Sequence, residues 1–177
     1  ESPSIPDVTI SGTNSTGASL VATGSTVSNL ITGTSSFSLK AKSGDKITIV
    51  ATKLGHTCSV TGDSIKPVLT DVTNLTIVCT PLQFSLKVTI SGLIGSTSVA
   101  LTNGTDSLTS GNSTAAKTLS ALVSYGVTYN ALVSTQPIGQ TCTIANGNGT
   151  MATSDITLSV SCVPNNYTVG GTASGNT

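Results

Sequence analysis

The four cysteines are the residues of this 177-residue chain whose spacing points most clearly to chemistry. Cys58 and Cys79 occupy the same places in the first half of the sequence as Cys142 and Cys162 in the second half. A zinc site needs four ligands close together, and neither half supplies a Cys-x-x-Cys pair or a second histidine. The simplest of the three possible pairings therefore joins Cys58 to Cys79 and Cys142 to Cys162 as disulfides.

Each predicted disulfide closes a loop of roughly 20 residues and joins the last strand of its half to an earlier one. In the chain-entropy description such a loop stabilises a small domain by about 3 kcal/mol. Because disulfides persist outside the reducing cytosol, we expect an extracellular or cell-surface location for this chain.

The remaining chemistry-bearing residues do not form a catalytic or metal-binding pattern. His56 is the only histidine, and its counterpart in the second half is Gln140, which indicates a polar position beside the disulfide. One histidine cannot supply a Ser-His-Asp triad to both halves, and Gly-x-Ser-x-Gly is absent. The acids lie mostly in turns, where they cap amides, and lack calcium-loop spacing. The sequence therefore predicts no enzyme, no metal and no cofactor; the acids considered are Asp7, Asp45, Asp63, Asp71, Asp106 and Asp155.

Composition excludes several classes of partner. Charged residues make up only 8% of the chain and the net charge is zero, so no field attracts nucleic acid. No apolar run approaches the ~20 residues needed to span a bilayer, which predicts no membrane insertion in this segment. The hydrophobic fraction of 37% is ample for a globular core, so we expect a mature or excised soluble segment.

The chain repeats itself. The string VTISG occurs at 8–12 and again at 88–92, and aligning the two copies brings LGHTCSV at 54–60 opposite IGQTCTI at 138–144. Each copy closes with a Cys-x-Pro strand. We therefore predict one repeat at 1–81 and a second at 82–164, followed by a remainder at 165–177.

Alternating Val, Ile, Thr and Leu, broken by Gly- and Asn-rich turns every eight to twelve residues, predicts an all-β fold. Only residues 115–123 could pass as helical, and their counterpart in the first repeat favours a strand. Each repeat is then a sandwich of six or seven strands in two sheets, immunoglobulin-like or transthyretin-like.

Three stretches resemble a family of tandem repeats from large secreted or surface-attached bacterial proteins: YTVGGT at 167–172, VALTNGTDSLT at 99–109 and LVSTQPIGQTCTIANGNGT at 132–150. The resemblance covers nearly the whole second repeat. The first repeat departs from it by having TKLGHTC and no Asn-Gly turn. The resemblance implies an extracellular, immunoglobulin-like, multi-copy stalk or adhesin module, with no catalytic residues to carry over.

The remainder begins a third copy. We expect it to be either the opening strand of a further repeat or a strand donated to a neighbouring subunit, because an exposed edge is a template for pairing. In both cases the partners are neighbouring copies of the same domain, within a longer chain or in a polymer. The residues concerned are Tyr167, Thr168, Val169, Gly170 and Gly171.

These observations predict an extracellular structural or adhesive repeat protein that forms part of a stiff stalk, fibre or filament at a bacterial surface. The alternative is a ligand-binding accessory module, for example one that binds carbohydrate. Sugar sites present flat aromatic rings, and Tyr125, next to a turn glycine, is the candidate for that role.

Overall fold

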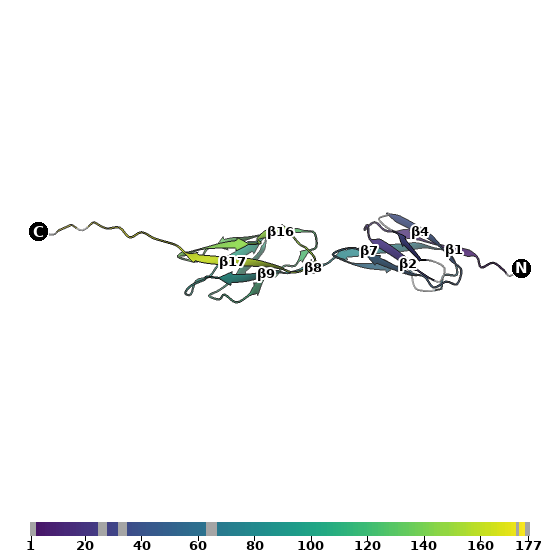
Figure 1. The fold of residues 1–177 in the computed structure, drawn as a ribbon, viewed down its shortest axis with the longest axis horizontal. Coiled ribbons are helices and arrows are strands. Elements are labelled where there is room, and N and C mark those ends of the chain that lie inside the picture. The colour runs from purple at the N-terminus through teal and green to yellow at the C-terminus, as the bar shows by residue number, and fades with distance from the viewer. Residues whose placement is uncertain (1–2, 25–27, 32–34, 63–66, 173, 176–177) are drawn as a thin grey trace. The chain divides into compact units, whose positions relative to one another are not determined.

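The computed structural model describes residues 3–24, 28–31, 35–62, 67–172, 174 and 175, and within them it is all-β. Asp63, one of the acids considered above, lies outside the described residues. The chain divides into two compact units, unit 1 at Glu1–Leu82 and unit 2 at Gln83–Thr177 (Figure 1). The sequence placed this boundary between residues 81 and 82.

The described residues of unit 1 form a sandwich of seven strands. One sheet has the order β4-β1-β7-β6 and the other β3-β2-β5. Alternate residues along β1 and β4 are buried, as expected where one face of each strand packs on a core. The strands are β1 (Asp7–Thr13), β2 (Ser19–Thr23), β3 (Ser28–Ile31), β4 (Ser36–Lys42), β5 (Thr48–Thr52), β6 (His56–Thr61) and β7 (Val72–Pro81).

Unit 2 has the same plan with more interruptions. Its main sheets have the orders β12-β9-β17-β15 and β11-β10-β14-β16, and β13 pairs with β8. The strands are β8 (Gln83–Phe84), β9 (Leu86–Ser91), β10 (Ala100–Asn103), β11 (Asp106–Thr109), β12 (Lys117–Thr118), β13 (Val123–Ser124), β14 (Thr128–Thr135), β15 (Gln140–Ala145), β16 (Asn148–Thr150) and β17 (Ile156–Pro164). The strand predicted at 115–123 is present only at 117–118 and again from Val123; Leu119, between these pieces, is buried in the core.

The prediction of an all-β fold with two immunoglobulin-like sandwiches in tandem is confirmed for the described residues, and each sandwich contains its own disulfide. The first strand predicted for a third repeat is not formed in the described residues after Pro164. In both units the first long strand is parallel to the last. β1 lies between β4 and β7, and β9 lies between β12 and β17. In immunoglobulin constant domains the first strand instead shares its sheet with the second.

The two VTISG strings are not structurally equivalent. Gly12 lies opposite Leu75, which precedes Cys79 by four residues, whereas Val88 lies opposite Leu158, which precedes Cys162 by four. The counterpart of Gly12 is therefore Val88, and the alignment of the two strings is wrong by four residues in the first strand. The structural match places Val8-Thr9-Ile10-Ser11-Gly12 on Phe84-Ser85-Leu86-Lys87-Val88.

A pair of carboxylates supports this corrected register. Asp71 Oδ1 accepts a hydrogen bond from the Thr9 amide at 2.6 Å, and Asp155 Oδ1 accepts one from the Ser85 amide at 2.8 Å. Thr9 and Ser85 are counterparts only in the corrected match. Each unit thus uses the aspartate immediately before its last strand to hold the start of its first strand.

Candidate functional site

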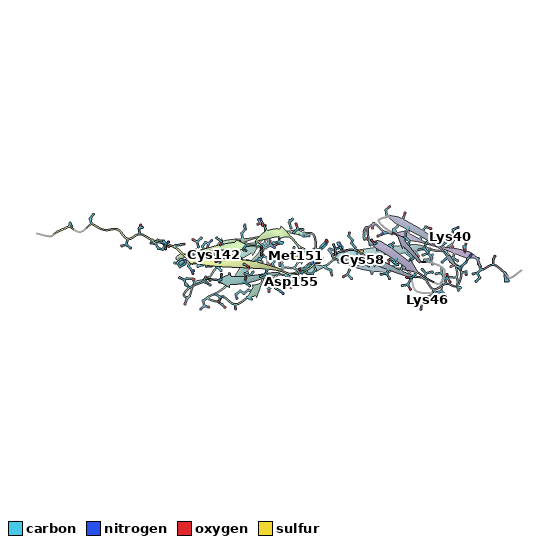
Figure 2. The ribbon with its side chains drawn as sticks, viewed as in Figure 1. Lys40, Lys46, Cys58, Cys142, Met151 and Asp155 are labelled. Atoms are coloured by element: carbon cyan, nitrogen blue, oxygen red, sulfur yellow. A yellow bond between two sulfur atoms is a disulfide. The ribbon has the colours of Figure 1, made fainter. Side chains whose placement is uncertain are left out.

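The two disulfides are cross-strand links within one sheet of each unit. Cys58 on β6 lies directly opposite Cys79 on β7, with a Cα–Cα distance of 4.0 Å. Cys142 on β15 lies opposite Cys162 on β17, with a Cα–Cα distance of 3.9 Å. The predicted pairing is the one present, and each disulfide joins the last strand to the strand before it in the sheet. Figure 2 shows Cys142 toward the end of unit 2 that leads to the C-terminal residues, and Asp155 toward the opposite end of the unit.

Gln140 is the most buried polar side chain near the second disulfide, with 2% of its surface exposed. Its Oε1 accepts hydrogen bonds from the Ile94 amide at 3.0 Å and the Thr97 hydroxyl at 3.3 Å. Its Nε2 donates to the Gly92 carbonyl at 2.7 Å. One side chain therefore fixes the loop that follows β9, because it satisfies a backbone donor and a backbone acceptor in that loop.

A second glutamine holds the disulfide strand itself. Gln136 Oε1 accepts from the Cys142 amide at 2.7 Å, and its Nε2 donates to the Cys142 carbonyl at 3.0 Å. The side-chain amide thereby takes the place of a neighbouring strand for this one residue. The Gln-Pro-Ile-Gly-Gln-Thr-Cys stretch at 136–142 thus anchors both the strand that carries Cys142 and the loop that follows β9.

Unit 1 reaches a similar result with different residues. Lys53 Nζ donates to the Thr16 carbonyl at 2.7 Å, and Thr16 is the counterpart of Gly92 in the corrected register. Lys53 therefore supplies in unit 1 one of the three hydrogen bonds that Gln140 makes in unit 2, the donation to a carbonyl after the first strand. His56 lies opposite Pro81 as Gln140 lies opposite Pro164, but its Nδ1 interacts with the Leu54 carbonyl at 2.8 Å. Both side chains are polar and lie beside a disulfide, but the Leu54 carbonyl that His56 reaches differs from the partners of Gln140.

The carboxylates act on strand ends, as the sequence predicted for acids in turns. The Lys87 ammonium, 2.9 Å from Asp155, and the Ser85 amide lower the pKa of that carboxyl. The Ser120 hydroxyl and the Ala121 amide lower the pKa of Asp106.

A Lys42 ammonium 2.6 Å away lowers the pKa of Asp7. Among the described residues, no group of three or more His, Cys, Asp or Glu side chains is placed to hold a metal ion.

The aromatic side chains do not assemble into a binding platform in the described part of the chain. Phe37 and Tyr129 are buried in the cores of units 1 and 2. Tyr125, the residue considered for carbohydrate, is half-buried in the turn between β13 and β14. A hollow of about 500 Å³ in unit 1 and one of about 260 Å³ in unit 2 are lined mainly by Ser, Thr and small residues. Within the same residues, no helix has the length and apolar character that a membrane crossing requires.

The point at which the chain leaves each unit is built in the same way. The Leu82 amide donates to the Gly55 carbonyl at 2.8 Å, and the Asn165 amide donates to the Gly139 carbonyl at 2.9 Å. Asn165 is held further, since its Oδ1 accepts from the Thr141 hydroxyl at 2.7 Å. Beyond this exit, the described residues of 166–175 form no strand, and Tyr167 and Val169 are 76% and 100% exposed.

No protein-family model matches the sequence, and no curated protein matches it either. Among solved structures, the chain is similar to two B repeat units of the collagen-binding protein of Staphylococcus aureus. The identity is 13% and the TM-score 0.31, over 92% of this chain and 50% of that one. The chain thus spans about half the length of that structure, and a likeness of this strength carries no argument about function.

Proposed function

We propose that this chain is a load-bearing, non-catalytic repeat segment of an extracellular stalk, fibre or adhesin at a bacterial surface. The observation that carries the proposal is the parallel pairing of the first and last strands in both units. In unit 2, six consecutive pairs join Leu86–Ser91 to Ile156–Ser161.

Parallel pairing decides how a pulling force is distributed. The chain enters a unit at the start of the first strand and leaves at the end of the last strand, so the two ends of the parallel pair are pulled in opposite directions. The interstrand hydrogen bonds lie across the pulling direction and are loaded together, in shear. Breaking them together requires more force than opening them one after another.

The disulfides reinforce this arrangement. Each one ties the last strand to its other neighbour, β6 in unit 1 and β15 in unit 2. Load on β7 is therefore shared with β6 through a covalent bond, and load on β17 is shared with β15. Disulfides of this kind persist in an oxidising compartment, which supports an extracellular location.

The junctions support an array of more than two units. One residue, Leu82, separates the end of β7 from the start of β8, and its amide is bonded to unit 1. Asn165 repeats that attachment at the end of unit 2. The following residues keep the spacing of the first junction, with Tyr167 five residues after Cys162 and Phe84 five residues after Cys79.

The test is electron microscopy of the native surface material, combined with antibody labelling of this segment on intact cells. The proposal predicts label along extended projections outside the cell. Label confined to the cytoplasm, or to compact enzyme particles, contradicts it.

A further inference from the structure

The two disulfides differ in how far their sulfur atoms are covered. Cys142 and Cys162 are buried, with 3% and 4% of their surfaces exposed, and belong to the core of unit 2. Cys58 and Cys79 are only partly buried and pack against the core of unit 1. A dissolved reagent therefore reaches the disulfide of unit 1 in the folded protein, whereas it reaches that of unit 2 only after a local opening.

The surroundings of Cys79 suit a thiolate. The Thr16 hydroxyl lies 3.5 Å from the Cys79 sulfur and 3.0 Å from Asn14 Oδ1. Its single proton turns toward the sulfur once that sulfur carries a negative charge, because an ionised acceptor forms the stronger hydrogen bond. The Lys53 ammonium, 2.7 Å from the Thr16 carbonyl oxygen, places a positive charge beside the same residue. A nearby cation and partial exposure are the features that make a cysteine reactive.

Unit 2 has different groups at the matching places. Gly92 has no side chain, and it lies so close to the Cys162 carbonyl that an added Cβ would overlap it. The contact to the Gly92 carbonyl comes from the neutral Gln140 in place of a lysine. The amide and the carbonyl of Cys142 are held by Gln136. The second disulfide is thus buried and anchored by neutral side chains, as expected of a purely structural link.

We propose that the Cys58–Cys79 disulfide is a site of thiol–disulfide exchange, at which a small external thiol attaches covalently to Cys58. The thiolate of the small molecule attacks Cys58 Sγ and forms a new sulfur–sulfur bond there. The Cys58–Cys79 bond breaks, its electron pair leaves with Cys79 Sγ, and the resulting thiolate takes up a proton from water.

The direction of attack follows from the contacts of Cys79. Thr16 and Lys53 stabilise negative charge on its sulfur, and the sulfur that bears negative charge more easily is the better leaving group. The partial burial of both cysteines favours a small thiol over a cysteine on the surface of another protein.

The exchange does not depend on the proposed function, but it has a consequence for it. While the adduct persists, β6 is not tied covalently to β7, and the stretch between the two cysteines, which are 21 residues apart, is released. Unit 2 keeps its link under the same conditions. A small thiol thus makes unit 1 extensible and leaves unit 2 as it was.

The experiment treats the folded full chain with a large excess of reduced glutathione, because the freed Cys79 sulfur otherwise re-forms the link at high effective concentration. Samples are quenched in acid at a series of times and their thiols are alkylated. Mass spectrometry of proteolytic fragments then follows each disulfide and the position of the adduct. Three proteins are compared: the unchanged chain, Thr16→Val, which removes the hydroxyl at nearly the same volume, and the matched control Thr23→Val at an exposed residue of β2.

The unchanged chain and Thr23→Val are expected to react in unit 1 at least about tenfold faster than in unit 2, since unit 2 must first open locally. Their adduct is expected mainly on Cys58, with the alkylating agent on Cys79. Thr16→Val is expected to react in unit 1 about threefold more slowly and to distribute the adduct more evenly between the two cysteines. A variant that merely loosens unit 1 would react faster, so a slower reaction is specific to the lost hydroxyl.

Equal reactivity of the two disulfides, including none at either, overturns the proposal, as does a faster reaction in unit 2. An adduct mainly on Cys79 overturns it too, and so does a Thr16→Val variant that matches the unchanged chain in rate and adduct position. None of these results bears on the proposed load-bearing function, which is tested separately by the location of the segment on the cell.

Discussion

His56 lies opposite Pro81 in unit 1, and Gln140 lies opposite Pro164 in unit 2. Replacing Gln140 by histidine therefore gives unit 2 the residue that unit 1 has at this position. Alignment of the two repeats suggests that the exchange is harmless, because both side chains are polar. The structure predicts a different outcome: Gln140 makes three hydrogen bonds to the loop after β9, whereas His56 interacts with its own turn. Histidine at 140 has a different shape and leaves the Gly92 carbonyl and the Ile94 amide without their partner.

The expected cost follows from those three bonds. At about 1 kcal/mol of net stability for each, unit 2 loses about 2–3 kcal/mol. For a domain of this size that corresponds to a fall in Tm of roughly 10–20 °C.

Differential scanning calorimetry measures this fall, and hydrogen exchange assigns it to unit 2, with unit 1 as the internal reference. The matched control is Gln83→Ala, which removes an exposed glutamine of the same unit and changes stability by no more than about 0.5 kcal/mol. The reasoning is refuted if Gln140→His leaves unit 2 as stable as the unchanged protein.

Three further predictions concern the disulfides and the sheets of the two units. Reducing each disulfide lowers the free energy of unfolding of its unit by about 3 kcal/mol, seen as a lower denaturant midpoint in the presence of reductant; an unchanged midpoint contradicts this. Gly12→Ala destabilises unit 1 by about 1–3 kcal/mol because its Cβ meets the Leu75 carbonyl, while the neighbouring Ser11→Ala changes little; equal midpoints for the two variants would show the close approach to be unimportant. The lowered pKa of Asp155 adds stability above the unfolded pKa of about 3.9, and this stability is lost as pH falls through the lower folded pKa. Unit 2 therefore weakens below about pH 4 and does so less steeply in Asp155→Asn, as followed by pH-dependent unfolding; identical pH profiles would argue against it.

Much of the fold could be predicted because it depends on local patterns. Alternation of apolar and polar residues identifies strands, since one face of each strand packs on a core. The equal places of Cys58 and Cys142, and of Cys79 and Cys162, indicated the pairing that the structure contains.

The first-strand register could not be predicted from identical letters. VTISG is built from residues common throughout this chain, so its recurrence is weak information, and it placed Gly12 on Gly92. In the structure Gly92 has a φ of 73° and lies against the Cys162 carbonyl, whereas Gly12 lies against Leu75. The better guide to the register is the number of residues that separate the paired position on the last strand from Cys79 or Cys162. These cysteines are held in place by the disulfides, and the first strand pairs with the strand that carries them.

The partners of His56 and Gln140 could not be predicted from their shared position for a related reason. A position in a sequence alignment records which residue lies opposite the proline, but not which carbonyl its side chain reaches. In unit 1 the contact to the Thr16 carbonyl comes from Lys53, three residues before His56, whereas in unit 2 the contact to the Gly92 carbonyl comes from Gln140. The sequence did contain a signal for this difference. Where unit 2 has TQPIGQTC, unit 1 has TKLGHTC, which lacks the second glutamine and contains a lysine instead.

The measurement that tests the central claim most directly is single-molecule force spectroscopy on unit 1 within the full chain, with two sets of attachment points. Pulling at Asp7 and Pro81 loads the parallel pair of β1 and β7 in shear, whereas pulling at Asp7 and Thr73 opens the same pair from one end. The account predicts a several-fold higher unfolding force in the first geometry. It also predicts that reductant lengthens the unfolded chain by about 70 Å, the reach of the roughly 21 residues released when the disulfide opens. Equal forces in the two geometries would contradict a load-bearing role for the parallel strands.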